Sequence, residues 1–164
     1  MCYHFIMEAN FTFGKNLRTC FILIGIQASG KTTFAHRILS EYEYISLDQL
    51  HTRNNEQKAL ENTINTGLSC VVDNTNPTKS ERKKYVDLAK ENGYKVVGIY
   101  FRSAIEECSQ RNEQRTGKAQ VPLKAILATA KRLEQPTYSE GFDELYYVKI
   151  EDDDFAINKW DETV

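Results

Sequence analysis

The sequence of 164 residues predicts an α/β domain: a parallel sheet of about five strands with helices on both faces. Two observations support this prediction. Short apolar runs alternate with segments of helical periodicity along the chain, and such alternation is typical of right-handed βαβ units. In addition, residues 25–32 read Gly-x-x-x-x-Gly-Lys-Thr between an apolar run and an amphipathic segment, which is the pattern of a loop that wraps a phosphate.

Each predicted element is defined by its periodicity and by the residues that end it. The expected strands cover residues 18–24, 43–47, 69–72, 95–101 and 145–150. The expected helices cover residues 33–41, 54–65, 78–92 and 105–115, and Pro122 opens a last one. Residues 18–151 are expected to form one domain, preceded by an N-terminal extension over 1–17 and followed by an acidic C-terminal tail over 152–164.

The composition is that of an ordinary globular protein, with 41% hydrophobic and 27% charged residues and a net charge of −2. This charge excludes a chain that is basic as a whole. No apolar run approaches the roughly 20 residues that span a bilayer, so no membrane partner is expected. The four cysteines show no metal-ligand spacing, and the start of the chain lacks a signal-peptide pattern. We therefore expect a reduced, cytoplasmic protein.

The loop at residues 25–32 predicts that the protein binds ATP and Mg²⁺. Glycine tolerates backbone dihedrals that a side chain would forbid, so the backbone can wrap a phosphate. N–H groups at the start of the following helix then face the anion. Lys31 should reach the β- and γ-phosphates, and the Thr32 hydroxyl should bind Mg²⁺. The residues expected to contact the nucleotide are Gly25, Gln27, Ala28, Ser29, Gly30, Lys31, Thr32 and Thr33.

Two acidic residues stand at the ends of predicted strands. Asp48 follows the strand at 43–47, and Asp73 follows the strand at 69–72. Ligands gather at the carboxyl ends of parallel strands, so Gly25, Asp48 and Asp73 are expected along one rim. Asp48 is a candidate general base for an attacking hydroxyl, and Asp73 could hold Mg²⁺ or line the acceptor site. A helix cap for Asp48 and a turn role for Asp73 are the structural alternatives.

A basic segment follows the fourth predicted strand and its helix. Arg111 and Arg115 are four residues apart and share a helix face. Arginines over a nucleotide can stabilise the charge that spreads over a transferring phosphate, so residues 111–135 could form a lid that excludes water. An ion pair of one arginine with Glu107 or Glu113 is the alternative.

Several segments together resemble the kinase domain of polynucleotide 5′-hydroxyl kinases, including the kinase half of kinase-phosphatase repair enzymes. They are Val-Asp-Asn-Thr-Asn-Pro at 72–77 with Ser80, Arg82 and Tyr85, Tyr-Ile-Ser-Leu-Asp-Gln-Leu at 44–50, the Arg111-Asn112 and Arg115 spacing, and Glu-Gln-Pro-Thr-Tyr-Ser-Glu-Gly-Phe at 134–142. The resemblance covers about residues 20–150. The sequence departs from the family at Leu47, where members often carry arginine, and at His51, where some members do.

The resemblance implies a P-loop kinase fold with a helical lid. By position, Lys31, Asp48 and Arg115 are the implied catalytic residues, with Asp48 as general base for a 5′-hydroxyl. Further implied contacts are Arg111 with the nucleotide, Thr32 and Asp73 with the metal, and Asp48, Arg53, Asp73 and Asn74 with the acceptor. A phosphatase or ligase partner would complete a repair reaction.

Three functions therefore remain open. The first is an ATP-dependent kinase of 5′-hydroxyl ends of RNA or DNA, working by positioning and charge neutralisation. The second is a kinase of a small hydroxyl compound such as a nucleoside or an antibiotic. The third is an ATP-binding regulatory protein with little turnover. A polynucleotide acceptor needs an open basic groove, for which the candidates are His51, Arg53, Arg82, Lys83 and Lys84. The Arg82-Lys83-Lys84 run could instead be an exposed helix surface.

Overall fold

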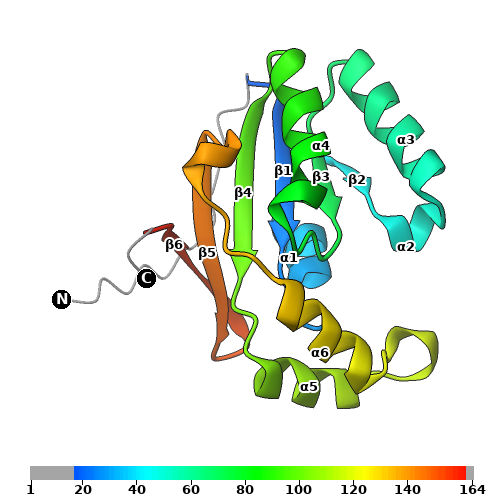
Figure 1. Cartoon of the computed structure of the whole chain (residues 1–164), viewed down its shortest axis with the longest axis vertical. Coiled ribbons are helices and arrows are strands. Elements are labelled where there is room, and N and C mark those ends of the chain that lie inside the picture. Colours follow the sequence, from blue (N-terminus) through cyan, green and yellow to red (C-terminus); the bar gives the residue numbers. More distant parts are fainter. Residues whose placement is uncertain (1–16, 162–164) are drawn as a thin grey trace.

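The computed structural model describes residues 17–161 and confirms the predicted α/β fold. Six strands form one sheet in the order β2-β3-β1-β4-β5-β6 (Figure 1). The strands are β1 (Thr19–Ile24), β2 (Glu43–Ile45), β3 (Cys70–Asp73), β4 (Lys95–Phe101), β5 (Glu144–Glu151) and β6 (Asp154–Lys159). The first five are parallel, and β6 runs antiparallel to β5. The N-terminal extension predicted over 1–17 lies, except for its last residue, outside the described residues.

The helices lie between the strands, as the alternation predicts. They are α1 (Lys31–Ile38), α2 (Leu47–Leu50), α3 (Arg53–Asn65), α4 (Lys79–Glu91), α5 (Ile105–Glu113) and α6 (Leu123–Arg132), with short 3-10 turns η1 (Gly117–Ala119) and η2 (Tyr138–Glu140). No helix among residues 17–161 is long and apolar enough to cross a membrane.

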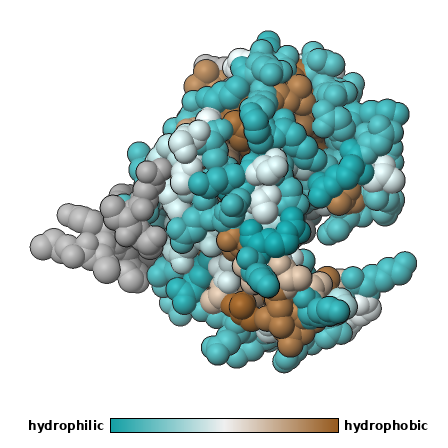
Figure 2. Space-filling model, in the orientation of Figure 1, coloured by the Kyte–Doolittle hydropathy of each residue, from teal (hydrophilic) through white to brown (hydrophobic). Residues whose placement is uncertain are grey.

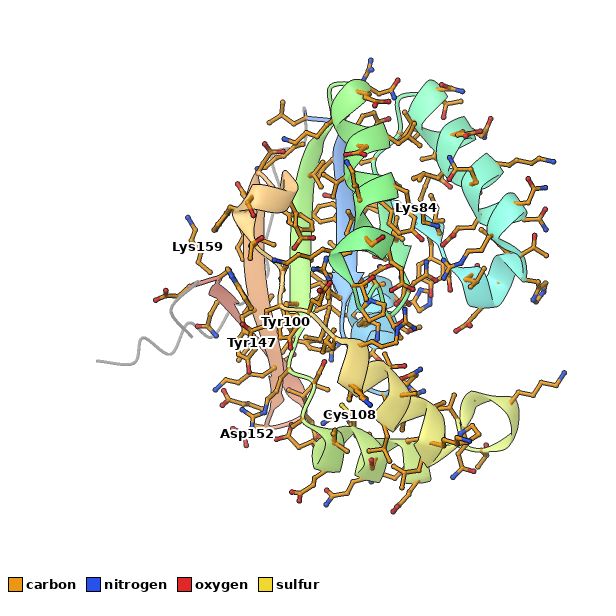
Figure 3. All side chains as sticks on the ribbon, in the orientation of Figure 1. Lys84, Tyr100, Cys108, Tyr147, Asp152 and Lys159 are labelled. Carbon is orange, nitrogen blue, oxygen red and sulfur yellow. The ribbon has the colours of Figure 1, made fainter. Side chains whose placement is uncertain are left out.

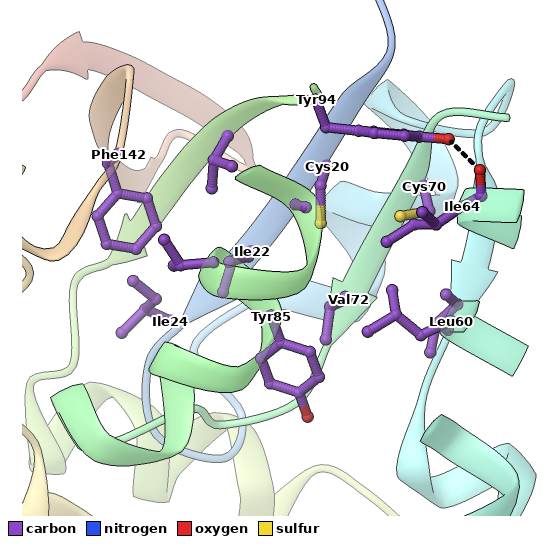
Figure 4. Close-up of a cluster of buried hydrophobic side chains, with 14 of the residues drawn as sticks. Cys20, Ile22, Ile24, Leu60, Ile64, Cys70, Val72, Tyr85, Tyr94 and Phe142 are labelled. Carbon is purple, nitrogen blue, oxygen red and sulfur yellow. Dashed lines mark hydrogen bonds between the residues drawn. The ribbon is translucent and has the colours of Figure 1, made fainter. Parts of the chain in front are cut away.

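Helices cover both faces of the sheet. Leu60 of α3 and Tyr85 of α4 belong to a buried cluster with Ile22 and Val72 of the central strands (Figure 4). On the opposite face, Phe34 of α1 packs with other apolar side chains of the same central strands. Burial of large apolar side chains on both faces explains why the central strands read as continuous apolar runs rather than alternating ones.

The described cysteines are free thiols within the core, as predicted. Cys20 and Cys70 are register partners on the neighbouring strands β1 and β3 (Figure 4). Cys108 of α5 packs against Ile126 of α6. All three are fully buried, so they act as small apolar residues of the core.

The sixth strand corrects the expectation of an acidic tail from residue 152 onward. Asp152 and Asp153 both have positive φ angles, 49° and 60°, as in a type I′ hairpin turn. The following strand β6 pairs with β5 and packs Phe155 and Ile157 against the α1 face. The turn was missed because Asp-Asp lacks the glycine that usually marks it, although the alternation of Phe155 and Ile157 was a strand signal.

The second strand is also shorter than predicted. It ends at Ile45, and the Ser46 hydroxyl then accepts a hydrogen bond from the Asp48 N–H (3.3 Å), which starts the short helix α2. Serine is a strong N-cap residue because its hydroxyl accepts a hydrogen bond from an N–H of the first helical turn that has no partner within the helix. Asp48 therefore lies on a helix rather than directly after a strand.

The helices α5 and α6 form a separate layer beyond the carboxyl end of the sheet (Figure 1). Their contact includes Cys108, which is labelled in Figure 3, and Ile126. Both side chains pack on Ile26 of the phosphate loop. The apolar side chains of α6 are only partly buried, since Leu123 and Leu127 are 54% and 45% exposed. The helices α5 and α6, which lie within or next to the segment predicted as a lid, therefore pack on the loop at residues 25–32.

Candidate active site

The carboxyl ends of the parallel strands meet at one rim, as the sequence predicts. The Gly25 N–H donates to the Thr75 carbonyl (3.0 Å), which joins the loop after β1 to the loop after β3. The Leu47 N–H donates to Asn74 Oδ1 (2.9 Å), which adds the helix after β2. In Figure 2 the surface is hollowed between the region of α2 and α3 and the lid helix α6, beside this rim.

The phosphate loop holds a set of backbone donors that have no partner. No N–H group of residues 27–30 donates a hydrogen bond to any of residues 17–161. Gly30, with a φ of 102°, precedes α1 without a side-chain cap, and the first turn of α1 carries no acidic residue. Orphan N–H groups at a helix start bind anions well. The loop therefore fits the phosphates of a nucleotide.

The β5–β6 hairpin packs against this loop at Gly30. A Cβ atom on Gly30 would lie 2.9 Å from Ile150 Cδ1 and 3.3 Å from the Phe155 ring. Phe155 also contacts Phe34 of α1, with ring centroids 5.1 Å apart. Two reasons therefore favour glycine at position 30: the positive φ angle, and the lack of space for a side chain next to the hairpin.

Lys31 is buried at the centre of the site. Its Nζ donates to the Ile26 carbonyl (2.8 Å) and to Ser29 Oγ (3.4 Å), and the residue is 7% exposed. Burial lowers the pKa of Lys31 to about 8. The negative charges of Asp73 and Asp48 oppose this pKa shift, and the charge of Arg115 adds to it. All three predicted partners therefore lie within electrostatic reach of Lys31.

We expect ATP binding to take up a proton at alkaline pH. Bound phosphates favour charged Lys31 and restore its pKa, so the affinity for ATP should fall as the pH rises from 8. At pH 8.5, binding should take up about three quarters of a proton. Calorimetry in two buffers of different ionisation enthalpy measures this number. The Lys31→Met protein serves as control and should take up none; an equal uptake in both proteins would contradict the assignment.

Oxygen ligands suited to Mg²⁺ meet beside Lys31. The Thr32 hydroxyl donates to Asp73 Oδ2 (2.6 Å), and the Tyr44 hydroxyl donates to the same oxygen (2.6 Å). Mg²⁺ binds through one or two protein oxygens together with substrate phosphates, so Thr32 and Asp73 fit this ion. Residues 17–161 hold no cluster of three or more His, Cys, Asp or Glu side chains suited to a metal. The contact of Tyr44 with Asp73 had no signal in the sequence.

Asp48 presents its carboxylate to solvent at the rim. The residue is exposed on α2, and its carboxylate accepts no hydrogen bond and forms no ion pair within residues 17–161. Its backbone N–H, rather than its side chain, takes part in the helix cap. The structural alternative of a capping carboxylate therefore does not apply, and the side chain is open to solvent.

The two lid arginines contact carbonyl groups rather than acidic residues. Arg111 Nε donates to the Ala28 carbonyl of the phosphate loop (2.8 Å), and Arg115 Nη1 donates to the Ala119 carbonyl (3.3 Å). The alternative of an ion pair with Glu107 is wrong, because Glu107 pairs with Arg102 (3.1 Å). Arg111 thus ties the lid to the loop, while Arg115 stays half-buried at the lid edge.

A buried glutamate in contact with Asn74 of the rim was not predicted from the sequence. Glu56 of α3 is fully buried and accepts hydrogen bonds from the Tyr85 hydroxyl (2.7 Å), Lys84 (3.0 Å), Arg53 (3.1 Å) and the Asn74 amide. Its burial opposes ionisation, but these hydrogen bonds outweigh burial and hold its pKa below the usual value. The only indication in the sequence was that Glu56 lies four residues before Leu60, a spacing that places both on the same face of a helix.

Arg82 does not line an acceptor groove, and it is not an exposed helix residue either. Its side chain is fully buried and forms two hydrogen bonds with Glu140, 2.8 and 2.9 Å long. It also donates to the carbonyls of Asn76 (3.0 Å), Pro77 (3.2 Å) and Glu134 (3.1 Å). This arginine therefore joins the loop after β3 to the chain that leaves the lid.

Comparisons with known proteins identify the family of the chain. A family model described as an AAA domain matches residues 21–136. The chain is 31% identical over 147 residues to a bifunctional polynucleotide phosphatase/kinase of Schizosaccharomyces pombe. The aligned region covers 85% of this chain and 36% of that protein. A relative from Acanthamoeba polyphaga mimivirus, described in similar words, is 30% identical over 144 residues, covering 83% of this chain and 34% of its own length. The chain thus spans about a third of the length of both curated relatives.

Solved structures share the fold. A gluconokinase from Sinorhizobium meliloti 1021 superposes with a TM-score of 0.58 at 20% identity, over 81% of this chain and 83% of that chain. Kti12 of Chaetomium thermophilum in complex with ADP-AlF3 superposes with a TM-score of 0.62 at 20% identity, over 82% and 90%. The chain therefore belongs to the AAA domain family, has a P-loop kinase fold, and resembles polynucleotide kinases as its motifs predict.

Proposed function

We propose that the protein is an ATP-dependent kinase that transfers the γ-phosphate of ATP to a 5′-hydroxyl end of RNA or DNA. The observation that carries the proposal is the solvent-facing carboxylate of Asp48, within electrostatic reach of buried Lys31 at the phosphate loop. A kinase needs a carboxylate that orients or deprotonates the acceptor hydroxyl opposite the γ-phosphate.

In this reaction the acceptor oxygen forms a bond to the γ-phosphorus while the bond to the β-phosphate oxygen breaks. The hydroxyl proton passes to Asp48, and the products are a 5′-phosphate end and ADP. Lys31 and the N–H groups of residues 27–30 bind the phosphates, and Arg115 neutralises charge from the lid. Thr32 and Asp73 would hold Mg²⁺, which supplies further charge neutralisation. Closure of residues 111–135 would exclude water from the reacting groups.

The proposed enzyme differs from a small-molecule kinase, such as the gluconokinase that shares the fold, in the compound that accepts the phosphate. The similarity to polynucleotide phosphatase/kinases supports the nucleic acid. A phosphatase activity, which the name of the fission yeast relative includes, would belong to a partner or to another segment. The three buried free thiols fit the cytoplasmic location that we propose.

The test is transfer from γ-labelled ATP to 5′-hydroxyl RNA and DNA oligonucleotides with Mg²⁺. We expect label on the 5′ end, a transfer rate about 100-fold or more lower for Lys31→Ala, and inhibition by rising salt. Nucleosides and sugars are assayed in parallel. Label on a small compound alone would contradict the proposal in favour of a small-molecule kinase, and ATP binding without any transfer would favour a regulatory protein.

A further inference from the structure

The carboxylate of Asp73 is held by protein hydroxyls at only one of its two oxygens. Its Oδ2 accepts hydrogen bonds from Thr32 and Tyr44, both 2.6 Å long, and the residue is 6% exposed. Its Oδ1 accepts no hydrogen bond from any of residues 17–161. A buried carboxylate needs partners to stay charged. One oxygen of Asp73 is therefore fixed by the protein, and the other stays available to a ligand.

The sheet directs the Tyr44 side chain toward Asp73. Tyr44 of β2 is the register partner of Val71 on β3, which lies two residues before Asp73. Because side chains alternate along a strand, Tyr44, Val71 and Asp73 all lie on the same face of the sheet. Tyr44 and Val71 accordingly pack in the apolar cluster on the α1 face. The pairing of β2 with β3 thus brings the Tyr44 hydroxyl to the end of β3.

Helix α1 holds the Tyr44 ring from the other side. Thr32 and His36 are four residues apart in α1, so both lie on one face of this helix. The His36 ring packs on the Tyr44 ring, with centroids 4.7 Å apart and an angle of 36° between the planes. Thr32 and Tyr44, which both donate to Asp73, are therefore fixed relative to each other by the contact of α1 with β2.

The Tyr44 hydroxyl remains a hydrogen-bond donor at neutral pH. Partial burial raises its pKa, and the hydrogen bond to Asp73 and the negative charge of Asp73 raise this pKa further. A hydroxyl that donates to a carboxylate forms a short, charge-assisted hydrogen bond, about twice as strong as a neutral one. Loss of the Tyr44 hydroxyl would leave Asp73 with Thr32 as its one protein donor within residues 17–161.

We propose that Tyr44 is a positioning residue for Mg²⁺: its hydroxyl fixes Oδ2 of Asp73 and so leaves Oδ1 free for the ion or for a water molecule bound to it. The inference rests on the proposed function, which uses ATP together with Mg²⁺. Groups that orient metal ligands typically change metal affinity about 10- to 100-fold when they are removed. Tyr44 would therefore set the affinity of the site for the metal rather than its affinity for the nucleotide.

The experiment compares the wild type with Tyr44→Phe, which keeps the ring that packs on His36 and removes the hydroxyl. The probe is Mn²⁺, which takes the same oxygen ligands as Mg²⁺ and is detected when free by electron paramagnetic resonance. Mn²⁺ is titrated into protein held in excess over ADP. The Kd of Mn²⁺ should rise about 10- to 100-fold in Tyr44→Phe, while the affinity for ADP in EDTA stays within about twofold of the wild type.

The matched control is Tyr42→Phe, the same chemical change in the residue just before β2. The Tyr42 ring packs on Phe21, with centroids 4.9 Å apart. Tyr42→Phe should therefore keep the wild-type Kd for Mn²⁺.

The Mg²⁺ dependence of phosphate transfer gives a second measurement. In Tyr44→Phe, the free Mg²⁺ concentration at half-maximal rate should rise by about the same factor as the Kd of Mn²⁺, and kcat at saturating Mg²⁺ should return to within about threefold of the wild type. This recovery separates a positioning role from general damage to the site, which added Mg²⁺ would not repair.

The outcomes separate this inference from the proposed function. If the wild type phosphorylates an oligonucleotide and Tyr44→Phe keeps the wild-type Kd for Mn²⁺, the role of Tyr44 is wrong while the kinase assignment stands. A low kcat of Tyr44→Phe that saturating Mg²⁺ does not restore also overturns this role. If the wild type phosphorylates no oligonucleotide, the proposed function is wrong. Binding of Mn²⁺ then still tests Tyr44, since a weaker Kd in Tyr44→Phe alone supports the inference and an equal Kd overturns it.

Discussion

Asp48→Asn is expected to lower kcat for phosphate transfer about 100- to 10,000-fold, the usual contribution of a general base. The amide keeps the shape of the side chain but cannot accept the hydroxyl proton. Asp48 makes no side-chain hydrogen bond within residues 17–161, so the free energy of unfolding should change by less than about 0.5 kcal/mol. Steady-state kinetics with an oligonucleotide acceptor and a thermal melt measure the two effects.

The matched control is Asp87→Asn, the same chemical change on the surface of α4, where the carboxylate pairs with Lys83 and with no other side chain of residues 17–161. Its kcat should equal that of the wild type within about twofold, because exposed pairs contribute little. The affinity for ATP should be similar in the wild type, in Asp48→Asn and in Asp87→Asn. Retention of more than a tenth of the wild-type kcat by Asp48→Asn would show that another group takes the proton.

Arg82→Met is expected to destabilise the protein by about 3–5 kcal/mol, the cost of breaking a buried ion pair by removing one partner. The substitution would leave Glu140, 9% exposed, without its cation. It would also remove the hydrogen bonds to the carbonyls of Asn76, Pro77 and Glu134. Urea unfolding followed by circular dichroism gives the free energy, with Lys83→Met as an exposed control expected to lose less than about 0.5 kcal/mol.

A double-mutant cycle isolates the charge pair from the other contacts. The Arg82→Met/Glu140→Gln protein should be more stable than Arg82→Met alone, because the second change removes the uncompensated buried charge. Additive losses in the double variant would mean that the carbonyl contacts of Arg82, and not its pairing with Glu140, stabilise the junction between α4 and the lid.

The parts of the site that lie in consecutive residues could be predicted from the sequence. The Gly-x-x-x-x-Gly-Lys-Thr pattern located the phosphate loop, and the buried strand β4 over 95–101 has the predicted bounds. Both depend on local backbone preference and on periodicity, which the sequence carries directly. The order of strands and helices also placed Gly25 and Asp73 on one rim, because carboxyl ends of parallel strands meet.

Boundaries that depend on a competing local interaction were less well predicted. The strand over 43–47 stops at Ile45 because the Ser46 side chain caps α2 instead. The tail after residue 152 became strand β6 because the edge of β5 and the apolar face over α1 were available to it. Ser46 lies within the segment predicted as a strand and is itself a helix-start signal, whereas the partners of the tail lie in other segments of the chain.

The sequence by itself determined the fold class, the phosphate loop and the candidate base Asp48, since each follows from nearby residues. Only the tertiary structure decided how the buried charges pair. Arg82 meets Glu140 across 58 positions, and Glu56 meets Tyr85 across 29. A buried charge is stable only with a partner in contact, and that partner comes from whichever element packs against it. Packing therefore buried Arg82 completely, while Arg53 and Lys84 stay partly exposed to solvent.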